Sequence, residues 1–146
     1  MAMAIRVDWQ RGAVHADRTR IEVGSDGQLG EDIRRLCSSA QPAANGAVRY
    51  RVLQKITFGG HAGECVIDVN EGQLASVTIL FDTIRFFDKS ITESKIVRSI
   101  AKSAGLTVVS EHPAVAQLEP RAWGVAEFRY DPRQGDLSFE AQFRND

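Results

Sequence analysis

The segment His61-Ala62-Gly63-Glu64-Cys65 holds three side chains that could bind a metal or form a thiolate–imidazole pair within five residues. Along an extended chain, however, His61 and Cys65 would lie more than about 12 Å apart, which is beyond the reach of a proton transfer. We therefore interpret the segment as a loop leading into a strand, with Cys65 pointing into the core. A small enzyme with a site near His61 and Cys65 stays an alternative.

The rest of the sequence contains no motif that would identify a catalytic or cofactor-binding site. His15, His61 and His112 are scattered, and no two of them have the i, i+4 spacing of a helical zinc site. A Gly-x-Ser-x-Gly elbow, a Walker loop and a Rossmann glycine fingerprint are all missing. We predict no catalytic residue, no cofactor and no tightly bound transition metal.

Several acidic side chains stand where strands are expected to end or turn. These residues are Asp68, Glu71, Asp82 and Asp88. Acidic residues at turns are usually only solvated. If several of them converge on one rim of the sheet, their mutual repulsion would mark a site for a positively charged partner. Glu71, Asp82 and Asp88 are therefore candidate protein-binding residues.

Residues 122–143 predict a hairpin with one apolar and one charged face. The apolar face would carry Phe128, Tyr130, Leu137, Phe139 and Phe143, and the other face Glu127, Arg129, Ser138, Glu140 and Gln142. Pro132 and Gly135 explain the intervening loop as a turn. Trp123 opens the first strand on the charged face, and an exposed tryptophan near arginines is typical of a protein-binding hot spot. Trp123 and Arg129 join the candidate binding residues.

The elements before this hairpin are predicted mainly as strands. Alternating apolar residues indicate a strand at 5–9, and further extended segments follow at 14–16 and 21–23. Asp26 stands where the N-cap of a short helix belongs. Residues 40–47 are predicted to form a surface loop.

The central part of the chain predicts a meander of three strands. They are expected at 48–58, 64–69 and 74–81, with Asn70-Glu71-Gly72 as a tight turn. Short connections of this kind imply antiparallel pairing. A strand at 107–110 is expected to follow the second helix.

The second helix is predicted over residues 90–104. Ser90 and Glu93 form a capping box at its start, and an apolar stripe runs along one side. Gly105 is placed to end the helix in the left-handed conformation. Runs of strands with two helices predict one α+β domain spanning residues 1–146, with a mainly antiparallel sheet of about six to eight strands.

Composition excludes several classes of protein. The 146 residues are 43% hydrophobic and 25% charged, as in an ordinary globular protein. A net charge of −1 gives no basic field for nucleic acid. No stretch approaches the ~20 apolar residues of a membrane span, and the start of the chain does not resemble a signal peptide. We expect a cytoplasmic protein that binds neither nucleic acid nor a membrane, with Cys37 and Cys65 as buried free thiols.

By elimination, the sequence favours a protein-binding module. Bacterial cognate inhibitors (immunity proteins and antitoxins) and secretion chaperones need no catalytic residues, only a rigid scaffold with a complementary surface. The partner would then be another protein, resembling a toxin or an effector, which this chain neutralises or escorts. An alternative is a small-ligand or assembly domain that works as an oligomer, such as a homodimer, through an open sheet face.

Overall fold

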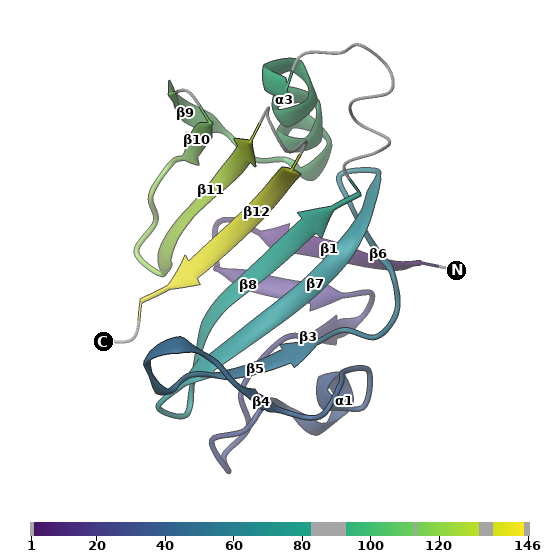
Figure 1. The fold of residues 1–146 in the computed structure, drawn as a ribbon. Coiled ribbons are helices and arrows are strands. Elements are labelled where there is room, and N and C mark those ends of the chain that lie inside the picture. The colour runs from purple at the N-terminus through teal and green to yellow at the C-terminus, as the bar shows by residue number, and fades with distance from the viewer. Residues whose placement is uncertain (1, 83–92, 113, 132–135, 145–146) are drawn as a thin grey trace.

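The computed structural model describes residues 2–82, 93–112, 114–131 and 136–144, and in these ranges it is mostly β (Figure 1). Twelve strands join in one sheet. They are β1 (Met3–Asp8), β2 (Ala13–Ala16), β3 (Thr19–Arg20), β4 (Gln41–Pro42), β5 (Val48–Arg51), β6 (Ile56–Phe58), β7 (His61–Asn70), β8 (Gln73–Phe81), β9 (Val108–His112), β10 (Val115–Leu118), β11 (Gly124–Asp131) and β12 (Asp136–Phe143). The described helices are α1 (Glu31–Arg34), a short 3₁₀ turn η1 (Ala44–Gly46) and α3 (Glu93–Ala104).

The predicted fold class, an α+β domain with six to eight strands in a mainly antiparallel sheet, is wrong. The sheet has twelve strands and is mixed, because β1 pairs in parallel with β6. The predicted strand at 48–58 is two strands, β5 and β6, which pair with different parts of β7. The two-residue strands β3 and β4 are too short to show a period-2 pattern in the sequence.

The sheet divides at the long strand β7. The first residues of β7 pair with β6, which leads to β1, β2 and β3, whereas its last residues pair with β5. On its other edge β7 pairs with β8, and the order continues through β12, β11, β10 and β9. Figure 1 shows β1 and β2 passing behind β7, β8 and β12. The sheet thus folds back on itself and forms two layers.

The core lies between these layers. Alternate residues of β7, β8, β11 and β12 point into it, among them Cys65, Ile67, Ile79, Phe128 and Phe139. β1 and β2 contribute the opposite wall, and α3 adds the buried residues Ile96, Val97, Ile100 and Ala101. The apolar stripe predicted for this helix is confirmed.

Two predicted turns are confirmed. Asn70 pairs with Gln73 across the β7–β8 hairpin, and the two residues between them have positive φ angles, 52° for Glu71 and 73° for Gly72. Positive φ at both central positions is the geometry that matches the right-handed twist of a hairpin. Gly105 follows the end of α3 with a φ of 72°. Ser90, the predicted cap of this helix, lies outside the described residues.

The first helix differs from the prediction. α1 begins after Gly30, and no side chain caps it. The Asp26 carboxylate instead accepts a hydrogen bond from the Gln28 amide, at 3.0 Å. Gly27 separates Asp26 from the helix with a φ of 78°, so the chain turns before the helix begins. No described helix is long and apolar enough to cross a membrane.

Candidate functional site

The thiols do not form a nucleophilic site. Cys65 is completely buried opposite Ile79, and this burial raises the pKa of its thiol to about 12, with a smaller contribution from Cys37. Burial also raises the pKa of Cys37 to about 11. At neutral pH both groups are protonated, and a protonated thiol is a poor nucleophile. His61 and Cys65 stand at the two ends of a five-residue stretch of β7, so the strand holds them apart.

We expect both thiols to resist modification in the folded protein. At pH 8, Ellman's reagent should titrate two thiols per chain in denaturant and react only slowly without it. The thiols titrate near pH 9 when unfolded and at about 11 and 12 when folded. The contribution of the two thiols to the free energy of unfolding is therefore complete below pH 9 and is lost as the pH rises toward about 12. Immediate reaction of the native protein would contradict this burial.

The predicted carboxylates that lie within the described residues do not converge on one rim. Glu71 lies in the β7–β8 turn and Asp82 follows the far end of β8, so the nine residues of this strand separate them by roughly 30 Å. Asp82 forms an ion pair with Lys55, at 2.8 Å. Asp68 lies within β7, where it pairs with Arg49. Asp88 lies outside the described residues.

Trp123 does not stand exposed on the charged face. Its ring is part-buried and packs edge-on against Trp9, with 4.9 Å between centroids, and against Phe143 at 5.3 Å. Its Nε1 donates a hydrogen bond to the Trp9 carbonyl, at 2.8 Å. The alternation of β11 does not extend to Trp123, because a tight turn between Arg121 and Gly124 precedes the strand.

One of the two layers contains six adjacent strands, β5, β7, β8, β12, β11 and β10. We call the side of this layer that points away from the core the open face. In Figure 1 none of the described helices lies in front of β7, β8, β12 and β11. Cross-strand pairing arranges its side chains in three rows: Glu64, Leu80, Ser138, Arg129 and Val115; Arg51, Val66, Thr78, Glu140, Glu127 and Gln117; and Arg49, Asp68, Ser76, Gln142 and Val125. Of the predicted binding residues, Arg129 lies on this face.

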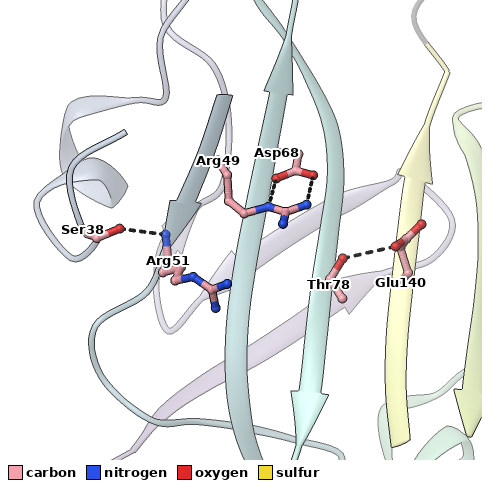
Figure 2. Close-up of polar contacts among 6 residues, drawn as sticks. All are labelled: Ser38, Arg49, Arg51, Asp68, Thr78 and Glu140. Carbon is pink, nitrogen blue, oxygen red and sulfur yellow. Dashed lines mark hydrogen bonds and ion pairs between the residues drawn. The ribbon is translucent and has the colours of Figure 1, made fainter. Parts of the chain in front are cut away.

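Polar side chains on the open face are held in place by one another (Figure 2). Arg49 donates two hydrogen bonds to Asp68, from Nε at 2.8 Å and from Nη2 at 2.9 Å. These bonds raise the pKa of Arg49, and the charge of Glu140 adds to the effect. Thr78 donates from Oγ1 to Glu140, at 3.4 Å. Two-pronged arginine–carboxylate pairs fix geometry well, so the side chains in this part of the surface are ordered by contacts within the chain itself.

Apolar side chains interrupt this polar surface. Leu80 and Val125 are 39% and 38% exposed, and Val109 on β9 is 55% exposed. Val109 and Val125 line a hollow of about 310 Å³ between β9, β10, β11 and β12. Glu127 and Glu140 line the same hollow. We call it the glutamate hollow.

Comparison with known proteins gives no match to a family model, to a curated protein or to a solved structure. Within the part of the chain that the structure describes, no three His, Cys, Asp or Glu side chains are grouped to hold a metal ion. The outer-face residues of the final hairpin were predicted from alternation. The sequence did not indicate that β8, β7 and β5 extend the same face, because that depends on which strands become neighbours.

Proposed function

We propose that this chain is a protein-binding module that holds its partner on the open face. The observation that supports this best is the combination of exposed apolar residues with ordered ion pairs on six adjacent strands. Aliphatic contact area surrounded by pre-arranged polar groups is what specific interfaces use. The three rows and the glutamate hollow approach the ~20–30 residues that one side of a standard interface contains.

The partner is a protein that this chain neutralises or escorts, as cognate inhibitors and chaperones do. Binding takes place in the cytoplasm, where a reducing environment keeps Cys37 and Cys65 as the free thiols they are in this fold. Such a module needs no nucleophile, which agrees with the high pKa values of both thiols.

A pair of matched leucine variants tests this proposal. Leu80→Arg places a charge in the first row of the open face, whereas Leu53→Arg makes the same change in the segment between β5 and β6. We expect affinity capture from the native host to recover a specific partner with the wild type and with Leu53→Arg, and to lose it with Leu80→Arg. Losing one well-placed interface side chain typically weakens binding by about 2 kcal/mol.

Both leucines are exposed, Leu80 by 39% and Leu53 by 73%, so neither variant should unfold the protein. Equal denaturation midpoints would verify that. Equal capture by Leu80→Arg and the wild type would refute the open face as the binding surface. Turnover of a substrate by the isolated protein, abolished by His61→Ala, would favour an enzyme instead.

A further inference from the structure

The glutamate hollow contains a like-charge pair. Glu127 on β11 and Glu140 on β12 are directly opposite each other in the register of the final hairpin. Their side chains lie on the same face and line the same hollow. Like charges in this arrangement destabilise a sheet. The free protein therefore carries an electrostatic cost that an added positive charge would remove.

The neighbouring groups do not fully neutralise this pair. Arg129 donates to Glu127 at 2.8 Å, but its own side chain is 65% exposed, so water weakens the interaction. Among the described residues, Glu140 accepts hydrogen bonds from the neutral groups of Thr78 and Gln142. No cation among the described residues forms an ion pair with Glu140. The charge of Arg49 also acts on Glu140, but both hydrogen bonds of this guanidinium go to Asp68. Within the described ranges, the two carboxylates of the hollow thus form one ion pair of their own, with the exposed Arg129.

The remaining wall of the hollow is mostly apolar, although the side-chain amides of Gln117 and Gln142 also line it. Val109, Pro120 and Val125 line it beside the two carboxylates. A long side chain with an aliphatic stem and a cationic end matches this combination, because the stem can cover the valines while the charge reaches the glutamates. The volume of about 310 Å³ is at the lower end of ligand pockets, which suits one side chain rather than a larger molecule.

We propose that the glutamate hollow receives a basic side chain of the partner protein, held between Glu127 and Glu140. This inference rests on the proposed function and specifies it, since it states which chemistry the partner presents. The occupant is a lysine or arginine on a protein surface. Recognition comes from charge complementarity across the interface, which also guides the orientation of binding.

A nuclear magnetic resonance titration with two model peptides tests this site. The probes are acetyl-Gly-Arg-Gly-amide and the same peptide with uncharged citrulline in place of arginine. We expect the arginine peptide to shift the amide signals of Val125, Glu127 and Gln142, with an affinity at least tenfold higher than that of the citrulline peptide. Equal affinities, or shifts confined to other strands, would overturn the proposal.

The variant Glu140→Gln supplies a second readout. Removing one charge relieves the repulsion, so the denaturation midpoint should stay the same or rise, while the affinity for the arginine peptide falls at least tenfold. Glu64→Gln is the matched control, because it lies on the open face outside the hollow. A lower midpoint for Glu140→Gln, or an equal loss of affinity in Glu64→Gln, would contradict the assignment.

The two proposals can fail separately. If Glu140→Gln captures the partner as well as the wild type while Leu80→Arg does not, the open face binds a partner but the hollow does not receive its basic side chain. If neither variant changes capture, the open face itself is not the binding surface.

Discussion

Replacing Phe139 by alanine is expected to lower the free energy of unfolding by about 4 kcal/mol. Its ring is 1% exposed and stands at the centre of the core. It stacks on Phe58 with 4.8 Å between centroids and packs against Phe128 at 5.0 Å. Both the aromatic contacts and the cavity left by the ring contribute to the loss. Denaturant unfolding monitored by circular dichroism would measure it.

Ser138→Ala is the matched control for this variant. Ser138 is the preceding residue of β12, but its side chain points to the open face. Its replacement should change the free energy of unfolding by no more than about 0.5 kcal/mol. If both variants lost the same stability, the division of β12 into a core side and an outer side would be wrong.

Trp123→Ala is expected to lower the free energy of unfolding by about 3 kcal/mol, because Trp123 belongs to an aromatic cluster with Trp9 and Phe143. The change also removes the hydrogen bond that Trp123 donates to the Trp9 carbonyl. Gly12 has a φ of 69°, and the Trp123 ring lies where a Cβ at that residue would stand. The indole thus packs directly against Gly12, in the turn between β1 and β2.

Trp123→Phe separates the contributions to this loss. It keeps most of the aromatic packing and removes the donor, so a loss of about 1 kcal/mol is expected. Thermal unfolding of both variants, compared with the wild type, provides the measurement. An unchanged midpoint for Trp123→Ala would contradict the structural role and return this residue to the candidate binding residues.

Local patterns predicted the local structure well. The alternation in residues 122–143 identified both faces of the final hairpin except at Trp123, because a period of two is a direct consequence of strand geometry. The turn at Glu71 and Gly72 followed from residue types that tolerate positive φ. The stripe on α3 followed in the same way from helical periodicity.

These local patterns could not predict which distant segments of the chain pair with each other. The parallel contact of β1 with β6 joins segments about fifty residues apart, and no local signal specifies it. β10 (Val115–Leu118) was not predicted from the sequence. Trp123 was misplaced for a related reason, since its burial depends on Trp9, which is 114 residues away in the sequence.

The candidate site could also be predicted only in part from the sequence. Glu127, Arg129 and Glu140 were assigned to the outer side of the hairpin from the sequence. The direct opposition of Glu127 and Glu140 depends on the register, which pairs Asp131 with Asp136 at the end of the hairpin. The apolar wall of the hollow comes partly from β9, which reaches this place only through β10.

The most direct test of the open face is site-specific photocrosslinking at Leu80 and at Leu53. A photoreactive amino acid would replace each leucine in turn, and the protein would be irradiated in lysate of the native host. Leu53 is the more exposed of the two, 73% against 39%, so random collision would favour crosslinks at position 53. We predict one specific partner crosslinked from position 80 and none from position 53. A partner crosslinked from position 53 alone would contradict the proposal that the open face binds it.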